Sequence, residues 1–333
     1  MSQWDQIVTE EDEGFHKKDI MEWYYIAGIF DDTTPQFEDW VFVNTFLITQ
    51  GIREFNSMWI FPTHQAKVFD IGYMNLKPRS IKASKRRVDA SYKNNLFKGF
   101  YPNYHLYFEG IENKYIFDLK FKADAEVKWV TKKGSNERII RADKSSYLYD
   151  YFIPRILHKG TLKVDGKSYP VRANGYYEHV RGFVDPTETK GWLWIGIPRA
   201  EGKMKKLAIN IGTAFNLDDS PQNQMIYYTE NGKDYGTFEG YDIKILETDK
   251  FEGTDYPSKL QLTSEEGSDK MDIVFTRLPS THRVTGGREN ALIQAIFITG
   301  PCSCKGYLEW NGKKYEINSI SIGSSMYLTK IGK

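Results

Sequence analysis

The chain has 333 residues, and its 45 Lys and Arg against 44 Asp and Glu give a formal net charge of +1. This balance excludes a global positive field that would attract nucleic acid, so we expect no nucleic-acid partner. The length favours two domains over one. A basic-then-apolar signal pattern and an apolar run of about 18 residues are both missing, which predicts a cytoplasmic protein with no membrane span.

Aromatic residues are unusually frequent: 22 Tyr, 20 Phe and 8 Trp make up 15% of the chain. Such residues favour β-strands and also line pockets for apolar ligands. The two cysteines, Cys302 and Cys304, are too few and too close in sequence for a zinc site, and the histidines lack metal-ligand spacing. We therefore expect reduced thiols, no metal and no cofactor. The basic cluster at 77–87 is most simply a solvated loop or edge strand.

In chain order, residues 1–19 form a polar leader whose acidic start we expect to be solvated. Runs rich in apolar and aromatic residues then predict strands in the first half, and residues 115–121 alternate between apolar and charged residues as in a sheet with one dry face. No long segment has helical periodicity, so the predicted class is all-β. The predicted strands are 22–30, 40–48, 55–61, 67–73, 88–93, 104–109, 115–121, 192–198, 207–215, 225–229, 241–247, 259–263, 271–277, 291–299 and 317–328.

An internal repeat supports two domains. The segment Gly160–Val171 matches Gly306–Ile317, and each reads as a strand, an Asp-Gly or Asn-Gly turn and a return strand. The strand that opens at Trp23 likewise matches the one that opens at Trp192. We therefore predict an N-terminal domain over 20–183 and a C-terminal domain over 190–333. The oligomeric state stays open.

The segment Gly175–Gly182 combines two tyrosines, a carboxylate, an imidazole and a guanidinium. In a strand, Tyr177, His179 and Arg181 would point to one face and Tyr176 and Glu178 to the other, so Glu178 and His179 would not touch. The second repeat has Ile320–Ser324 at this place, with no ionisable side chain. This asymmetry predicts a function for the strand beyond supporting the fold.

Three short motifs resemble the two-domain lipocalin-like family that includes carotenoid 1,2-hydratase, AttH-type proteins and fungal Diels–Alderases. They are Glu22-Trp23-Tyr24-Tyr25, Gly175-Tyr176-Tyr177-Glu178-His179 and Gly191-Trp192-Leu193-Trp194. The chain departs from the family pattern in the middle motif, where Glu178 replaces the usual Asp and Tyr replaces the common Trp. The resemblance implies two tandem antiparallel β-barrel domains and a largely apolar ligand at or between them.

The candidate site centres on Glu178 and His179 as acid and base near the seam of the two domains. A carboxyl group in a dry pocket has a raised pKa and can protonate an olefin, and aromatic faces stabilise the resulting cation. The alternative is a buried pair that holds the fold, with Arg181 as a partner. Glu22 would either pair with a basic residue or contact the ligand. Trp192 and Trp194 would either pack in the core or contact the ligand. The predicted ligand-binding residues are Glu22, Trp23, Tyr25, Tyr177, Arg181, Trp192 and Trp194.

These features together predict a cofactor-independent hydratase, isomerase or cyclase that acts on a hydrophobic small molecule of isoprenoid or polyketide type. The alternative is a non-catalytic carrier or sensor of such a ligand.

Overall fold

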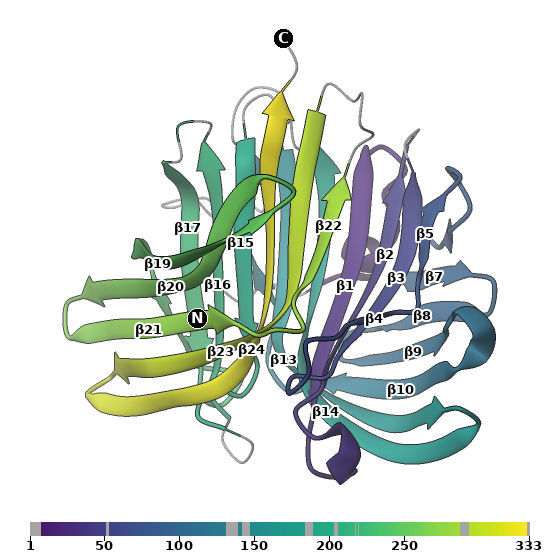
Figure 1. The fold of residues 1–333 in the computed structure, drawn as a ribbon, viewed down its shortest axis with the longest axis horizontal. Helices are drawn as coiled ribbons and strands as arrows, with labels where there is room; N and C mark the ends of the chain where they lie inside the picture. The colour runs from purple at the N-terminus through teal and green to yellow at the C-terminus, as the bar shows by residue number, and fades with distance from the viewer. Residues whose placement is uncertain are drawn as a thin grey trace. The chain divides into compact units, whose positions relative to one another are not determined.

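The computed structural model describes residues 8–50, 53–130, 139–141, 147–183, 189–202, 206–216, 218, 220–286 and 293–331. The chain divides into two units: Met1–Pro62 with Val68–Val184, and Thr63–Lys67 with Asp185–Lys333. Each unit is built on one curled antiparallel sheet (Figure 1). The predicted all-β class with two tandem barrel-like domains is confirmed.

The sheet of the first unit has the strand order β4-β3-β2-β1-β14-β13-β10-β9-β8-β7-β6, with β5 beside β3 and with β11 and β12 beside β13. Three short helical segments accompany it: α1 (Glu10–Glu13), η1 (Pro35–Phe37) and η2 (Ile111–Asn113). Its strands are β1 (Met21–Phe30), β2 (Val41–Thr49), β3 (Glu54–Phe61), β4 (Phe69–Asp70), β5 (Tyr73–Leu76), β6 (Lys82–Ala83), β7 (Val88–Tyr92), β8 (Asn95–Phe100), β9 (Asn103–Glu109), β10 (Tyr115–Ala123), β11 (Lys128–Trp129), β12 (Ile139–Arg141), β13 (Tyr147–Val164) and β14 (Lys167–Phe183).

The sheet of the second unit has the order β18-β17-β16-β15-β24-β23-β21-β20-β19, with β22 beside β23. Its strands are β15 (Thr189–Ile197), β16 (Ala208–Asn216), β17 (Pro221–Thr229), β18 (Tyr235–Phe238), β19 (Asp242–Phe251), β20 (Thr254–Glu266), β21 (Asp269–Arg277), β22 (His282–Gly286), β23 (Ile293–Trp310) and β24 (Lys313–Ile331).

The two sheets repeat one topology, with β1, β14, β13, β10, β9 and β8 corresponding to β15, β24, β23, β21, β20 and β19. The long hairpins β13–β14 and β23–β24 turn at the predicted Asp-Gly and Asn-Gly pairs, whose four residues all have positive φ. A Cβ on Gly160 would lie 1.9 Å from the carbonyl oxygen of Asp118, and one on Gly306 would lie 1.9 Å from that of Asp272. Both hairpins therefore need glycine at the same point to approach the neighbouring strand.

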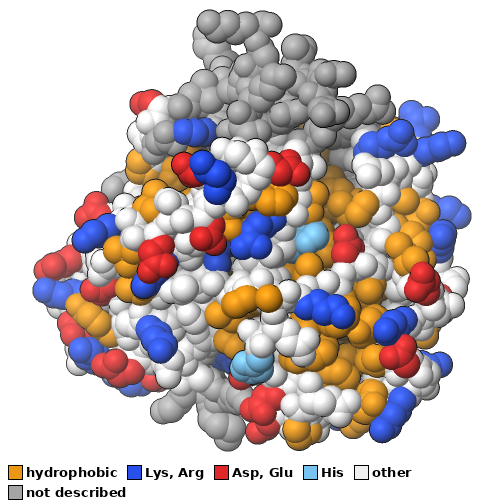
Figure 2. Space-filling model, in the orientation of Figure 1, with side chains coloured by type: hydrophobic (Ala, Val, Ile, Leu, Met, Phe, Trp, Pro, Cys, Tyr) orange, Lys and Arg blue, Asp and Glu red, His pale blue; other side chains and the backbone are white. Residues whose placement is uncertain are grey.

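Alternation along the strands separates a core face from an outer face in the first unit. In β10 the four predicted inward residues, Tyr115, Phe117, Leu119 and Phe121, are all buried, while the charged residues between them are exposed. The core also takes up Phe42, Phe97 and Tyr177. The second unit has its own core cluster. On the face seen in Figure 2, acidic and basic side chains are interspersed, as the near-zero net charge predicts.

The expectation of a solvated acidic leader is wrong for Glu13, which is fully buried. Its side chain accepts hydrogen bonds from the hydroxyl of Tyr104 and from the backbone N–H of Tyr101. The reason is that Thr9 caps the one-turn helix α1, and the chain then lies against the first sheet, where buried carboxylate oxygens find hydrogen-bond donors. Glu13, Asp19 and Glu22 of this segment are therefore buried in the first unit, while Lys17, Lys18 and Ile20 stay exposed.

Both cysteines are free and buried. Among the described residues, no helix has the length and apolar character required to cross a bilayer.

Candidate functional site

Strand β14 pairs with β1 on one side and with β13 on the other, and it divides the motif Gly175–Gly182 between two environments. Tyr177 and His179 point to the core face, where they contact Tyr151. Tyr176 lies on the opposite face and stacks on Tyr25, with ring centroids 5.5 Å apart. Glu178 shares the face of Tyr176 by strand alternation. The prediction that Glu178 and His179 form no contacting dyad agrees with this arrangement.

On the core face, the partly exposed His16 and four buried polar residues form a chain that we call the inner network: His16, Glu22, His179, Tyr151 and Tyr177. His179 Nε2 lies 2.7 Å from Glu22 Oε1, and His179 Nδ1 lies 3.2 Å from the Tyr151 hydroxyl. The Tyr151 and Tyr177 hydroxyls are 3.3 Å apart. Because an ionised carboxylate only accepts, His179 donates from Nε2 and accepts from Tyr151 at Nδ1. Both ring nitrogens are therefore engaged.

The charge state of the inner network follows from its contacts. Burial raises the pKa of Glu22, but hydrogen bonds from His16 and His179 outweigh it and lower this pKa to about 2. Burial lowers the pKa of His179, although Glu22 acts in the other direction. At neutral pH the network holds an ionised Glu22 and a neutral His179, whose ring also stacks on Tyr24 at a centroid distance of 4.4 Å.

Arg181 lies on the same face of β14 as Tyr177 and His179, but its contacts are with residues outside the inner network. Its Nη1 atom donates to Asp19 Oδ2 at 2.8 Å, and its guanidinium lies 3.8 Å from the ring centroid of Tyr149. Asp19 accepts a second hydrogen bond from the Tyr147 hydroxyl. Arg181 thus anchors the leader to the sheet, which supplies a structural role for this residue.

The side chains of His16, Glu22 and His179 offer three ligand-type atoms that lie within 4.8 Å of one another. Their convergence is accounted for by hydrogen bonding, since Glu22 Oε1 contacts both imidazoles and Glu22 Oε2 accepts from the backbone N–H of His16 at 2.8 Å. We therefore describe them as a hydrogen-bond network and route no chemistry through a metal.

On the opposite face, Glu178 and Asp150 form what we call the acid pair. Both are at least nine-tenths buried, and Asp150 Oδ1 has no hydrogen-bond partner among the described residues. Burial raises the pKa of Glu178 to about 8, against a smaller opposing effect of a hydrogen bond from Trp23. Burial and then repulsion from Glu178 raise the pKa of Asp150 well above its usual range. At least one of these carboxyl groups therefore holds a proton at neutral pH.

Aromatic side chains surround the acid pair. Glu178 lies directly opposite Tyr25 on β1 and Phe152 on β13, while Trp23 and Asp150 flank Val180 in the neighbouring row. On one face of a sheet, large side chains can reach diagonal neighbours on the adjacent strand, so Trp23 and Asp150 lie within reach of Glu178. The structure thus brings Trp23 and Tyr25 of the predicted ligand-binding set to the face of Glu178, whereas it places Tyr177, Glu22 and Arg181 on the other.

The second unit shows what the fold itself requires at these positions. By register, Ser324 of β24 corresponds to Glu178, and it lies opposite Trp194, the counterpart of Tyr25. Phe297 corresponds to Asp150 and contacts Trp192, the counterpart of Trp23, at a centroid distance of 6.1 Å. The sheet therefore folds with a serine and a phenylalanine where the first unit has two carboxyl groups.

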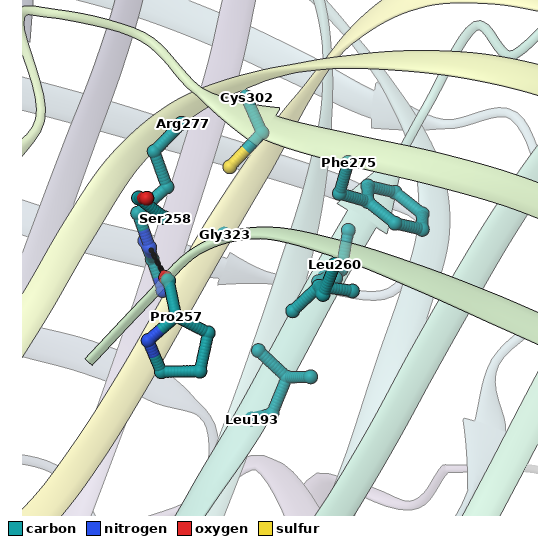
Figure 3. A pocket seen from close by; sticks show the side chains of 9 residues that line it. Leu193, Pro257, Ser258, Leu260, Phe275, Arg277, Cys302 and Gly323 are labelled. Atoms are coloured by element: carbon teal, nitrogen blue, oxygen red, sulfur yellow. Dashed lines mark hydrogen bonds between the residues drawn. The ribbon is translucent and has the colours of Figure 1, made fainter. Parts of the chain in front are cut away.

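A small cavity of about 10 Å³ lies in the second unit beside Arg277 and Cys302. Figure 3 shows the Arg277 side chain there with its hydrogen bond to the backbone carbonyl of Pro257. This volume holds about one water molecule. The cavity is too small for a substrate.

Sequence reasoning missed Asp150, Glu13 and His16. Asp150 could have been found from strand alternation, because it lies between Tyr149 and Tyr151 of a same-face tyrosine row, but its register with Glu178 needs the β13–β14 pairing. Glu13 and His16 gave no signal, since nothing in an acidic leader indicates which residue is buried.

The chain has the fold of two-domain lipocalin-like β-proteins. Solved structures with this fold include an AttH-like protein from Nitrosomonas europaea, with a TM-score of 0.71 at 14% identity over 96% of this chain and 97% of that one. Kievitone hydratase from Nectria haematococca has a TM-score of 0.64 at 14% identity, over 97% and 91% of the two chains. CghA with Sch210972 has a TM-score of 0.59 at 9% identity, over 97% and 94%.

The predicted resemblance is therefore confirmed at the level of the fold. By sequence, no family model and no curated protein matches the chain.

Proposed function

We propose that the protein is an enzyme of the hydratase, isomerase or cyclase type that protonates a hydrophobic small molecule, with Glu178 as the acid. The observation that supports this most directly is the acid pair: Glu178 is buried beside Asp150 among Trp23, Tyr25 and Phe152. A carboxyl group with a pKa of about 8 is still protonated at neutral pH and can act as a general acid.

The chemistry follows from these surroundings. Glu178 would give its proton to one carbon of a C=C bond, which leaves a cation on the neighbouring carbon. The electron-rich faces of Trp23 and Tyr25 would stabilise that cation. Water, or another group of the substrate, would then bond to the cation, and the proton lost in that step would return to the Glu178 carboxylate. The cycle needs no cofactor.

The internal repeat supports function over structure for the acid pair. Two buried carboxyl groups near one another are costly to a fold. The corresponding residues of the second unit, Ser324 and Phe297, avoid this cost in the same sheet. The name kievitone hydratase among the structural neighbours agrees with the proposed reaction class.

His179 is the second acid–base candidate, but both of its nitrogens already have partners in the inner network. Its role in our proposal is to hold β14 against β1 and β13, so that Glu178 keeps its place on the other face. A neutral imidazole between a carboxylate and a phenol is well suited to this because all of its polar atoms are satisfied.

A deuterium-labelling experiment tests the proposal. A hydrophobic extract of the source cells is incubated with the protein in D₂O, and the products are analysed by mass spectrometry. Wild type and the repeat-matched control Ser324→Ala should place solvent deuterium on carbon, and Glu178→Gln should not.

An infrared carbonyl band of a protonated carboxylic acid should also be present at pH 7 and be weakened by Glu178→Gln. Labelling by Glu178→Gln at the wild-type rate would contradict the assignment of the acid. Stoichiometric recovery of one unmodified apolar ligand, with no labelling by any variant, would identify a carrier instead.

A further inference from the structure

The outer face of the first sheet carries a continuous row of basic side chains, one from each of five neighbouring strands. Register places them directly opposite one another, from β8 through β9, β10 and β13 to β14. With adjacent strands about 4.8 Å apart, the row is about 19 Å long. We call it the basic row; it consists of Lys98, His105, Lys120, Lys159 and Arg172.

Three charges of the basic row, those of Lys120, Lys159 and Arg172, lie directly opposite one another, whereas Lys98 lies opposite Asp89 of β7. His105 Nε2 lies 2.7 Å from Asp118 Oδ1, so this imidazole has a partner. Lys98, Lys120 and Lys159 are exposed, and none of the three forms an ion pair with a described residue. Like charges directly opposite one another in a sheet destabilise it. The row is therefore a cost to the free protein that a bound anion would relieve.

Protection of a sheet edge does not explain these lysines. Lysine is common on edge strands, where it prevents pairing with other chains. However, β10 and β13 lie inside the sheet, with β9 and β14 as their outer neighbours. Lys120 and Lys159 therefore need another explanation.

The second unit again shows that the fold does not need this charge. The corresponding row runs through Lys244, Gln261, Val274, Lys305 and Asn318, so its two cations are separated by neutral residues. The contact between His105 and Asp118 is reproduced with a neutral donor, because Gln261 donates to Asp272 at 2.8 Å at the corresponding place. The continuous row is specific to the first unit.

A groove of about 660 Å³ lies along the basic row, so the positive charge lines a concave surface. Lys98, Lys120 and Lys159 line it together with Arg87 and Lys122, and no carboxylate takes part in its lining. Leu157 lies at its side with 44% of its surface exposed, at the position of Ser303 in the second unit. The groove is open to solvent and has room for a small organic ligand lying on the sheet.

We propose that this groove binds a small phosphorylated molecule with an apolar body. A phosphate monoester carries nearly two negative charges and three acceptor oxygens at neutral pH, which suits a cluster of lysine ammonium groups that act as point charges. Leu157 then contacts the apolar part. Binding of a single-stranded nucleic acid uses exposed aromatic side chains on which the bases stack. The aromatic residues that line this groove, Tyr104 and Phe121, are buried, so the groove suits a small ligand better.

The proposal is tested on the full chain by calorimetric titration with inorganic pyrophosphate and with decyl phosphate. A titration with NaCl at equal ionic strength is the control. The double variant Lys120→Gln/Lys159→Gln should bind pyrophosphate at least tenfold more weakly. The matched double variant of the second unit, Lys244→Gln/Lys305→Gln, should stay within twofold of wild type. Leu157→Ser should weaken decyl phosphate binding and leave pyrophosphate binding unchanged.

The thermal midpoint distinguishes binding from a structural role. Without ligand, Lys120→Gln/Lys159→Gln should unfold at the wild-type temperature or above it, because repulsion along the row is reduced. Three results would overturn the proposal: no pyrophosphate binding beyond the NaCl effect, equal losses in both double variants, or binding to phosphatidylserine vesicles that pyrophosphate does not displace. Deuterium labelling, which tests Glu178 as the acid, is a separate measurement, so the phosphate-binding proposal and the enzyme proposal can fail independently.

Discussion

The Nε2 atom of His179 lies 2.7 Å from Oε1 of Glu22, while the preceding residue, Glu178, projects from the opposite face of the same strand. Two adjacent ionisable residues are therefore held in separate environments by strand alternation alone. One environment stabilises the charge of its carboxylate, and the other raises the pKa of its carboxyl group to about 8. The structural and chemical roles of the motif can be separated by mutation.

Removal of His179 should strongly destabilise the first unit. His179→Ala removes the closest hydrogen-bond donor of the buried Glu22 carboxylate, although His16 still donates to it, and losing a hydrogen bond to a charged group costs about 1.5–3 kcal/mol. The matched variant Ser325→Ala alters the corresponding position of β24 and should cost less than about 1 kcal/mol. Urea unfolding at pH 7 measures both. A cost for His179→Ala equal to that of Ser325→Ala would contradict the inner network.

The same network should weaken in acid. The folded-state pKa of Glu22 is about 2, below its ordinary 4.5, so its contribution is present above pH 4.5 and is lost as the pH falls toward 2. The pKa of His179 is also lowered on folding, and its contribution is lost as the pH falls below its ordinary 6.5. The stability advantage of wild type over the double variant Glu22→Gln/His179→Ala, measured by urea unfolding, should therefore shrink as the pH falls below about 6.5.

The acid pair should have the opposite pH dependence. Because folding raises the pKa of Glu178 from 4.5 to about 8, the folded state binds more protons, and this stabilising contribution is lost as the pH rises through that window. At pH 9, Glu178→Gln should be more stable than wild type by on the order of a few kcal/mol, and at pH 5 the two should be similar. Asp150→Asn should act in the same direction. Ser324→Ala, measured in the same urea series, should show neither effect.

Glu13 provides an independent titration in the same unit. Burial raises its pKa to about 7 despite the hydrogen bond from Tyr104, so its ionisation destabilises the protein as the pH rises from 4.5 to 7. Glu13→Gln should recover roughly 3 kcal/mol at pH 8 and little at pH 4. Tyr104→Phe removes the hydrogen bond that favours the ionised form and should steepen the loss. A pH-independent effect of Glu13→Gln would contradict this assignment.

The fold could be predicted from the sequence because its signals are local. Alternation in residues 115–121 and the Asp-Gly and Asn-Gly turns each depend on a few neighbouring residues, and the structure agrees with all of them. The strands β8 and β22 were missed, since their sequences alternate poorly or contain glycine, and the short strands β5, β6, β11, β12 and β18 were missed because so few residues give no periodic signal. The full length of β13, β14, β23 and β24 was also missed, because separate local signals, such as 291–299 and the hairpin 306–317 in β23 and β24, were not joined into one strand.

The site could be predicted only in part. Glu178 and His179 were found from their residue types and from the repeat, and the division of β14 into two faces followed from alternation. Asp150 could not be placed beside Glu178 without the pairing of β13 with β14, which contains a bulge between Ile153 and Ile156. The basic row has the same origin, since its five members are scattered between residues 98 and 172 and only the strand register aligns them.

The equivalent close approaches at Gly160 and Gly306 have an evolutionary consequence. Two hairpins that need glycine at the same point, within sheets of the same strand order, are the expected remains of a duplicated and fused ancestral gene. A side chain would clash with the neighbouring strand at both glycines, whereas positions 178 and 324 carry different residues in the two units. The second unit thus serves as an internal reference for the first. The double variant Ser324→Glu/Phe297→Asp would test whether the second sheet also accepts an acid pair.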